Sequence, residues 1–439
     1  MRFGLLILII CLHLNMLALS LEEAIEIGLK NSPVILSAKE ALNQAKFDYL
    51  QANFDLFPTA NIIGGYSLYD PELSNTANNN ISYGVQANLP LFVGGRNWQN
   101  SRVKKNNYLI AENDFQSKKM TLINDIENKF YNVQEAILAK QIAEADFENA
   151  TIYEEIAQVR LDFNTISQAE FYRVKSDTQQ KMVRVITNQT SYLNYLQDLK
   201  SLLNVSKDIE IDSDDLLMDL PNDLFATKDI YTFDNIEKLL TELVQYGIDN
   251  NLNIQNNRLS LENLKKNVTT AMGNFFPSFN LSYRKEWQKF DFQDEFKDSS
   301  TLTLNASIPI FPIGNNTANY LKNKSNYKRV EYDQDTIENN LNLNIRSATL
   351  AWMSASQSTV FLKWSLEYSE NFYQQTLEKY RRGVISSMEL LDSILIYSNS
   401  RYQYINMKYN ILRNKANLKY LLNIETDEQL NQLLSVKSY

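Results

Sequence analysis

Hydrophobic and polar positions alternate along the chain with two different periods. Between residues 81 and 91, apolar side chains occupy every second position, and between residues 302 and 310 they do so again. A period of two predicts a β-strand with one apolar face. The segments 59–68 and 278–288, which lie just upstream, have the same character. The pattern therefore predicts two β-hairpins, at about 59–91 and 278–310.

The tracts that follow these strands have a helical period. Between residues 341 and 366, apolar and small residues are spaced alternately by four and three, as in the seam of a coiled coil. The seam consists of Leu341, Ile345, Ala348, Trp352, Ala355, Thr359, Leu362 and Leu366. No proline lies between Pro90 and Pro221, and no glycine lies between Gly95 and Gly247. Because both residues are disfavoured inside helices, we expect very long helices, one of them running from about 97 to 162.

The same features recur at a constant distance of 219 residues. Phe57-Pro58 recurs as Phe276-Pro277, where 277 − 58 = 219, and LPLF at 89–92 recurs as IPIF at 308–311, where 308 − 89 = 219. The chain is therefore an internal tandem duplication. Residues 21–204 form the first repeat and residues 236–424 the second, with an acidic connector at 205–235 and a tail at 425–439.

Each repeat is predicted to follow one plan. A helix, at about 21–56 in the first repeat, leads into the β-hairpin, and a long helical hairpin comes after it. The tips of the two helical hairpins are expected at about 160–167 and 380–387. A hairpin of strands packed on an ordinary globular core is the alternative, but no other segment supplies a second layer for such a sheet.

The N-terminal residues are typical of a signal peptide, which we place at 1–20. Arg2 precedes an apolar run, and Ala18-Leu19-Ser20 provides small residues of the kind a signal peptidase reads. A buried helix or a membrane anchor is the alternative, but the run is short for a bilayer span. Cys11 lies inside the run without small residues before it, which argues against a lipoprotein.

Removal of this segment limits the chemistry of the mature chain. Its only cysteine, Cys11, and its only histidine, His13, both lie within residues 1–20. Without a thiol or an imidazole, the usual nucleophile systems and the usual zinc or copper sites are excluded. We therefore expect no catalytic residues, no metal and no cofactor, so that the protein is not an enzyme.

Charge excludes another class of partner. The first 20 residues contain one base and no acid, so the mature chain has 42 basic and 52 acidic residues, and 42 − 52 gives a net charge near −10. Nucleic-acid binding depends on cationic neutralisation of phosphates, and nucleic acid is therefore not an expected partner. No stretch after the signal has about 18 uninterrupted apolar residues, so membrane entry is expected only through the strands.

Four strands are too few for a membrane barrel. The smallest natural barrels have about eight strands, and an open edge in lipid leaves backbone groups unpaired. The chain must therefore oligomerise if its strands enter a membrane. Two hairpins in each of three copies would give twelve strands, although the count does not by itself require three.

These features resemble the TolC family of outer-membrane channel-tunnels over essentially the whole mature chain. Two features carry the resemblance. One is the duplicated plan, in which Phe-Pro precedes a β-hairpin that ends in LPLF or IPIF, and the other is the second tip. That tip reads Tyr380 to Asp392, with a Tyr, a Gly, a Ser and then two acids three residues apart. The first tip follows the pattern less closely, since Asn164 stands where Gly383 does and Arg173 where Asp392 does.

The resemblance implies a fold that is mainly α with β. It implies a homotrimeric channel-tunnel with a long antiparallel α-helical barrel in the periplasm and a 12-stranded β-barrel in the outer membrane, four strands per subunit. Such a protein is the exit duct of a tripartite efflux or type I secretion system. Its expected partners are outer-membrane lipid, a periplasmic adaptor (membrane fusion protein) and an inner-membrane transporter of the RND, ABC or MFS type. Small toxic compounds or secreted proteins would pass through it.

The resemblance also assigns roles to residues at the tips. Glu389 and Asp392 are three residues apart and share a helix face, and with Glu170 they are the expected pore constriction or gate. Rings of acids favour cations. A solvated helix face is the ordinary alternative for such acids.

The turn residues of the tips are the expected adaptor contacts. They are Arg381, Arg382, Gly383 and Ser386 in the second repeat and Asn164 and Ser167 in the first. A helix-turn requirement is part of the reason for these residue types, because Gly and Asn tolerate the left-handed conformation that ends a helix.

Two other classes of function remain to be weighed. A trimeric coiled-coil surface or adhesive protein would share the signal and the long helices, but its strands would occur once, at the C-terminus. A periplasmic enzyme or soluble binding protein is disfavoured by the missing His and Cys and by the helix length.

Overall fold

The computed structural model of the chain describes residues 19–68, 79–207, 209–211, 233–291, 293–311 and 313–436. Most of the expected signal peptide, the loop of the first β-hairpin and most of the acidic connector lie outside the described residues, as do the last three residues of the tail. Leu19 and Ser20, at the end of the expected signal, are described. Leu19 forms a β-bridge with Ile211, and the Ser20 side chain caps the first helix.

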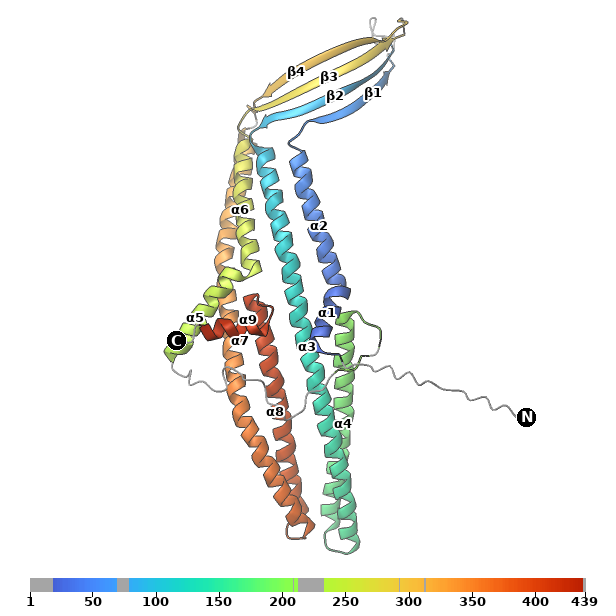
Figure 1. The fold of residues 1–439 in the computed structure, drawn as a ribbon, viewed down its shortest axis with the longest axis vertical. Helices are drawn as coiled ribbons and strands as arrows, with labels where there is room; N and C mark the ends of the chain where they lie inside the picture. The colour runs from blue at the N-terminus through green and yellow to red at the C-terminus, as the bar shows by residue number, and fades with distance from the viewer. Residues whose placement is uncertain are drawn as a thin grey trace, which may run out of the picture. The chain divides into compact units, whose positions relative to one another are not determined.

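The described chain divides into two compact units, drawn in Figure 1. The helical unit comprises the described residues of Met1–Ile35, Lys119–Gly247 and Asn342–Tyr439. The sheet unit comprises those of Leu36–Lys118 and Ile248–Leu341. The fold is mainly helical with one small antiparallel sheet, as the sequence predicts.

The sheet is built from four strands in the order β1-β2-β3-β4. The strands are β1 (Thr59–Ser67), β2 (Asn80–Val93), β3 (Ser278–Phe290) and β4 (Lys297–Ser307). Thr59 pairs with Asn88 in the first hairpin, and Ser278 pairs with Ser307 in the second. Because 278 − 59 and 307 − 88 both equal 219, the two hairpins have the same register. The β2–β3 pairing joins the first repeat to the second.

One strand is shorter than the sequence predicts. The alternation up to Ile310 predicts a strand to that residue, but β4 ends at Ser307. Its neighbour β3 begins at Ser278, which already pairs with Ser307, so β3 has no residue left to pair with positions 308–310. The corresponding part of β2 continues to Val93, because β3 lies beside it.

The helices of the sheet unit are α2 (Pro33–Phe54), α6 (Leu252–Gly273) and the adjoining parts of α3 (Arg96–Asp162) and α7 (Ile313–Arg381). Polar side chains join them. Ser101 bonds to Asn53 at 2.6 Å, and Asn106 donates to Glu262 at 3.0 Å. Each hydrogen bond of this kind contributes only modestly to the stability of the fold.

The predicted helix at about 21–56 is in fact two helices. The first is α1 (Leu21–Asn31), and α2 begins at Pro33. Ser32 between them has an extended backbone, with φ −66° and ψ 122°. In this repeat, Pro33 disfavours helical geometry in the residue before it. In the second repeat the same break separates α5 (Phe233–Asn250) from α6, and there the Asn251 side chain caps α6.

The helical unit packs α1 and α5 against two long helical hairpins. One hairpin is α3 with α4 (Gln168–Leu203), and the other is α7 with α8 (Ser387–Leu422). The predicted seam residues Leu341, Ile345, Trp352 and Leu366 are buried, so the period-3.5 pattern locates the core correctly.

The tail forms a short helix, α9 (Asp427–Val436), which an ion cluster fixes to α8. Asp427 accepts from Lys415 at 2.6 Å and from Lys419 at 2.9 Å, and Lys419 also bonds to Glu127 of α3 at 2.6 Å. Burial opposes the charge of Asp427, but the two lysines outweigh it and lower the pKa of Asp427 from 3.8. Burial raises the pKa of Glu127 from 4.5, against the pull of Lys419.

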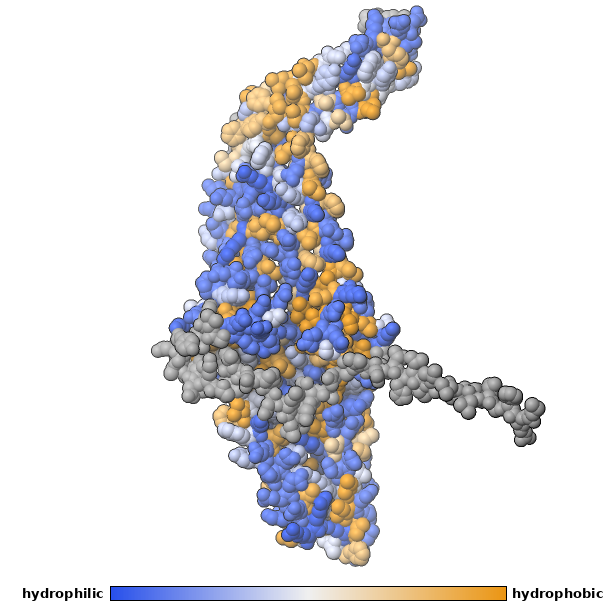
Figure 2. Space-filling view, in the orientation of Figure 1, coloured by the Kyte–Doolittle hydropathy of each residue, from blue (hydrophilic) through white to orange (hydrophobic). Residues whose placement is uncertain are grey.

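Many large apolar side chains remain exposed on the single chain. Figure 2 shows hydrophobic residues gathered over the part of the sheet that adjoins the helices of the sheet unit. Exposed apolar residues that lie next to the strand ends in the sequence include Phe57, Phe276, Ile308, Ile310 and Phe311. Among the described helices, none combines the length and the apolar character that a membrane crossing requires.

Candidate functional site at the helical tips

The two helical hairpins turn with the same backbone geometry. After α3 ends, Asn164 adopts a left-handed conformation with φ 56°, and after α7 ends Gly383 does so with φ 74°. The Thr165 amide donates to the Arg160 carbonyl at 2.8 Å, and the Val384 amide donates to the Lys379 carbonyl at 3.0 Å. These bonds satisfy helix carbonyls that would otherwise be unpaired. Asn and Gly at these positions are thus explained by the turn itself.

Each second helix begins at a serine cap. The Ser167 hydroxyl accepts from the Glu170 amide at 3.2 Å, and the Ser386 hydroxyl accepts from the Glu389 amide at 3.3 Å. Both acids therefore lie in the first turn of a helix, where the helix dipole favours negative charge. The predicted contact residues Asn164, Ser167, Gly383 and Ser386 all have this structural role.

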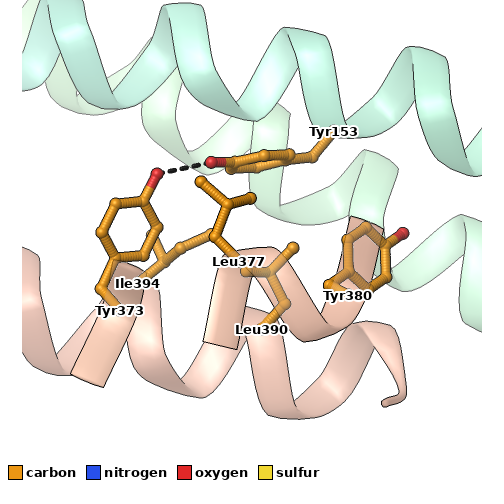
Figure 3. Close-up of a cluster of buried hydrophobic side chains, with 6 residues drawn as sticks. All are labelled: Tyr153, Tyr373, Leu377, Tyr380, Leu390 and Ile394. Carbon is orange, nitrogen blue, oxygen red and sulfur yellow. Dashed lines mark hydrogen bonds between the residues drawn. The ribbon is translucent and has the colours of Figure 1, made fainter. Parts of the chain in front are cut away.

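A cluster of buried side chains joins the two hairpins just behind the tips (Figure 3). Tyr153 of α3 shares a hydrogen bond of 2.5 Å with Tyr373 of α7, and it lies among Leu377, Leu390 and Ile394. Burial, followed by this bond, raises the pKa of the Tyr153 hydroxyl far above its usual range. The hydroxyl is therefore neutral at every physiological pH and acts as a fixed hydrogen-bonding group.

Arg160 and Tyr380 form a second link between the hairpins. The Arg160 guanidinium lies 4.1 Å from the centre of the Tyr380 ring, which is a cation–π contact. It also donates to the Tyr380 carbonyl. The Tyr380 hydroxyl in turn lies 3.3 Å from the Ser387 hydroxyl. This arginine is therefore held inside the contact between the hairpins.

The three acids predicted for the pore constriction lie in different environments. Glu170 accepts a hydrogen bond from the Ser387 amide at 3.0 Å, and so the first hairpin caps the first turn of α8 in the second. Glu389 and Asp392 are exposed on α8. Sequence reasoning grouped Glu170 with the other two because it corresponds to Glu389 at the 219-residue offset. The structure adds a contact that Glu170 makes with the second hairpin.

The predicted basic residues of the second tip are exposed. Arg381 and Arg382 both face solvent, and Arg382 is 3.6 Å from Glu378 in the preceding turn. Two apolar side chains, Phe163 and Val384, are also exposed at the turns. The tips thus present charged and apolar groups outward, above a buried core.

One polar link between the hairpins is not predicted by the sequence pattern. Asp146 of α3 is buried, accepts from the Ser398 hydroxyl at 2.6 Å and pairs with Arg401, both of α8. A cavity of about 30 Å³ next to this pair is large enough for a water molecule. Asp146 and Arg401 correspond to Ser365 and Met182 at the 219-residue offset. The link is therefore absent from the duplicated pattern, which is why repeat analysis missed it.

Among the described residues, no group of three or more His, Cys, Asp or Glu side chains lies close enough together to hold a metal ion.

Comparison with known proteins gives a consistent result for the whole chain. The sequence model of the outer membrane efflux protein family matches residues 24–205 and again residues 243–423. The two matches begin 243 − 24 = 219 residues apart, as the repeats do. No curated protein sequence matches the chain at a significant level.

Solved structures share the fold at low sequence identity. CusC is 19% identical with a TM-score of 0.79, and the match covers 92% of each chain. The CmeC outer membrane channel of Campylobacter jejuni is 16% identical with a TM-score of 0.79, covering 95% of this chain and 89% of that one. VceC of Vibrio cholerae is 14% identical with a TM-score of 0.78, covering 92% and 95%. At such identities the likeness establishes the fold alone.

Proposed function

The chain belongs to the outer membrane efflux protein family, and on that premise we propose that it is the exit duct of a tripartite efflux or type I secretion system. It is an outer-membrane channel protein that extends into the periplasm, and its family consists of non-enzymatic conduits. The observation that carries the proposal is the double family match, because it covers both repeats and so includes both hairpins of strands and both helical tips.

We further propose that three copies assemble. The sheet has two outer strands, β1 and β4, each with one neighbour among the described strands. Three copies supply twelve strands, which exceeds the minimum of about eight for a closed membrane barrel. Closure would also give partners to backbone groups at the two edges, which are costly to leave unpaired in lipid. The long helices would then line a duct in the periplasm.

The tips are proposed to meet the rest of the pump. The exposed Arg381 and Arg382, with the turn residues beside them, are suited to contact a periplasmic adaptor that is itself bound to an inner-membrane transporter of the RND, ABC or MFS type. Exposed Glu389 and Asp392 are proposed to form rings of acids at the constriction when copies assemble around an axis. Glu170, which caps α8, is proposed to hold that helix in position beside the constriction. Small toxic compounds or secreted proteins are the proposed cargo.

A trimeric adhesive protein is the second candidate. Such a protein would place its strands once, at the C-terminus. Here the described strands are internal and duplicated, and a helix, α9, follows them near the end of the chain. The arrangement therefore favours the duct.

Cell fractionation followed by gel electrophoresis without heating tests the proposal. We expect a heat-dissociable trimer in the outer membrane fraction, and a soluble monomer would contradict both the assembly and the duct. In the same membranes, Arg381→Glu combined with Arg382→Glu should abolish co-purification of an adaptor while the trimer persists. Arg329→Glu is the matched control, because it reverses an exposed charge on α7 outside the tip.

A further inference from the structure

The first described residues bear on where the expected signal peptide ends. A signal peptidase reads small residues before the bond that it cuts, and Ala18 and Ser20 are both small. The sequence pattern alone favours the bond after Ser20, because both small residues then precede the cut. We propose instead that the bond between Ala18 and Leu19 is cut, so that the mature chain begins at Leu19 and keeps Ser20. The inference requires export of the chain but not the proposed duct.

Ser20 is the N-terminal cap of α1. Its hydroxyl accepts from the Glu23 amide at 3.2 Å, and its own amide donates to the Glu23 carboxylate at 3.0 Å. This reciprocal pair of bonds is a capping box, and it satisfies two backbone amides at the start of the helix. A cut after Ser20 would remove both bonds from the mature protein.

Leu19 joins the start of α1 to the connector between the repeats. Its amide donates to the Glu210 carbonyl at 2.8 Å, and it forms a parallel β-bridge with Ile211. Leu19 and Ile211 are both buried, each with 9% of its surface exposed. A cut after Ser20 would therefore also remove the residue that holds this part of the connector beside α1.

The position of the new amino group favours the same bond. An α-amino group is largely protonated at neutral pH. A cut after Ser20 would place this positive charge on Leu21, the first residue of α1, where the helix dipole disfavours cations. A cut before Leu19 places the charge two residues earlier. There the ammonium can still donate to the Glu210 carbonyl, and its charge strengthens the bond.

Comparison with the second repeat shows that the cap belongs to the first repeat alone. Ser20 corresponds to Leu239, since 20 + 219 = 239, and Leu239 lies inside α5, which begins at Phe233. The helix thus extends further upstream in the second repeat, whereas α1 begins at Leu21. The duplicated pattern does not account for a cap at this position. A mature chain that begins just before the cap does account for it.

The proposed step is the hydrolysis of one peptide bond by a signal peptidase. Water adds its hydroxyl to the carbonyl carbon of Ala18, the carbon–nitrogen bond breaks, and the Leu19 nitrogen takes up the remaining proton. Ala18 supplies the small side chain directly before the bond. The peptide that is removed carries Cys11 and His13.

N-terminal sequencing and intact mass of the protein from cell envelopes test the assigned bond. We expect Leu19 as the first residue. A chain that begins at Leu21 would overturn the proposal, and so would an uncut chain. A chain that begins upstream of Leu19 would overturn the assigned bond while leaving the retention of Leu19 and Ser20 in place.

Two matched substitutions distinguish the two bonds. Ala18→Val enlarges the side chain directly before the assigned bond, and Ser20→Val enlarges the one directly before the alternative bond. In a pulse-chase experiment we expect Ala18→Val to accumulate as precursor and Ser20→Val to be processed as completely as the parent chain. Accumulation of the Ser20→Val precursor would overturn the proposal.

The processed Ser20→Val protein also tests why Ser20 is kept. It lacks the capping hydroxyl, so hydrogen exchange in the first turn of α1 should become about fivefold faster, as the loss of a helix cap predicts. Glu26→Gln is the matched control, because it changes an exposed acid of α1 outside the capping box. Unchanged exchange in Ser20→Val would remove the structural reason for keeping Ser20 and so would count against the proposal.

Thiol labelling of the denatured mature chain provides an independent test. The only native cysteine, Cys11, leaves with the signal peptide, so the parent protein should take up no maleimide. Ser20→Cys should be labelled, because the assigned bond lies before it. Leu21→Cys is the positive control, since it remains in the chain whichever bond is cut. An unlabelled Ser20→Cys beside a labelled Leu21→Cys would overturn the proposal.

Discussion

Two glycines allow close helix contacts in the helical unit. A Cβ on Gly28 of α1 would lie 2.4 Å from the Ile126 Cδ1, and a Cβ on Gly247 of α5 would lie 2.3 Å from the Ile345 Cδ1. Leucines at equivalent positions, Leu203 and Leu422, complete both contacts. These glycines are therefore needed for space, since both have ordinary helical backbones. The two contacts lie at positions related by the 219-residue offset, so each can be used to test what is found at the other.

Gly28→Ala should destabilise the protein, and adding Ile126→Val to the same chain should relieve part of that destabilisation. Overpacking costs about 1–3 kcal/mol, and alanine offsets up to ~1 kcal/mol through helix propensity. Ile126→Val deletes the atom that the new Cβ would meet. Thermal unfolding followed by circular dichroism should therefore show a double variant that is less destabilised than the sum of the two single variants, by roughly 1 kcal/mol.

The second repeat provides the control for this cycle. Gly247→Ala with Ile345→Val should show the same coupling, whereas Gly28→Ala with Ile345→Val should be additive. Additivity in the matched pairs would show that the glycines are not required to accommodate the isoleucine side chains.

At the scale of the element, α9 is attached by charges as well as by apolar packing. Leu430 and Leu434 are buried, and Asp427 binds Lys415 and Lys419. The lysines lower the pKa of Asp427 from 3.8. A carboxyl whose pKa is lowered in the folded state stabilises that state above its unfolded pKa and loses this effect as the pH falls. Protonation of Glu127 has the opposite effect on stability. Its pKa is raised in the folded state, so its protonation at low pH does not favour unfolding.

Hydrogen exchange should therefore show α9 loosening as the pH falls below 3.8, with the buried part of α3 around Glu127 still protected. Asp427→Asn should remove most of this pH dependence. It should also make α9 amides exchange about two- to fivefold faster at neutral pH, because partly exposed ion pairs contribute up to ~1 kcal/mol. Unchanged protection of α9 in this variant would show that the leucines alone hold the helix.

At the scale of the whole molecule, the effect of the exposed acids of the second tip on ion selectivity depends on how many of them come together. One copy carries one Glu389 and one Asp392, and the proposed assembly would repeat each of them in a ring. Rings of carboxylates favour cations and exclude anions. We expect Glu170 to contribute less to such selectivity, because its carboxylate caps α8 within the same chain.

Single-channel recording should reveal this difference. Glu389→Gln and Asp392→Asn should each lower the preference for cations over anions by at least about twofold, and the double variant should lower it further. Glu425→Gln is the matched control, since it removes an exposed acid that lies beyond the far end of α8. Equal selectivity in the parent protein and all four variants would show that the ring does not line the pore.

Particular residues and strands show which features of this protein are predictable from its sequence. Strand alternation located β1, β2 and β3, and the helical seam located Ile345 and Trp352 in the core. The break at Ser32 and the early end of β4 were not predicted. The first lies before Pro33 in one repeat and at the helix cap Asn251 in the other, and the second depends on a neighbouring strand that runs out of residues.

The sequence by itself determined the elements, the duplication and the turn residues of the tips, because these follow from local periodicity and from backbone conformation. Only the tertiary structure decided which side chains join the two hairpins. Tyr153 with Tyr373, Arg160 with Tyr380, and Asp146 with Arg401 are far apart in sequence and follow no repeat. Such contacts depend on how two long helical hairpins lie side by side, and no local period encodes that arrangement.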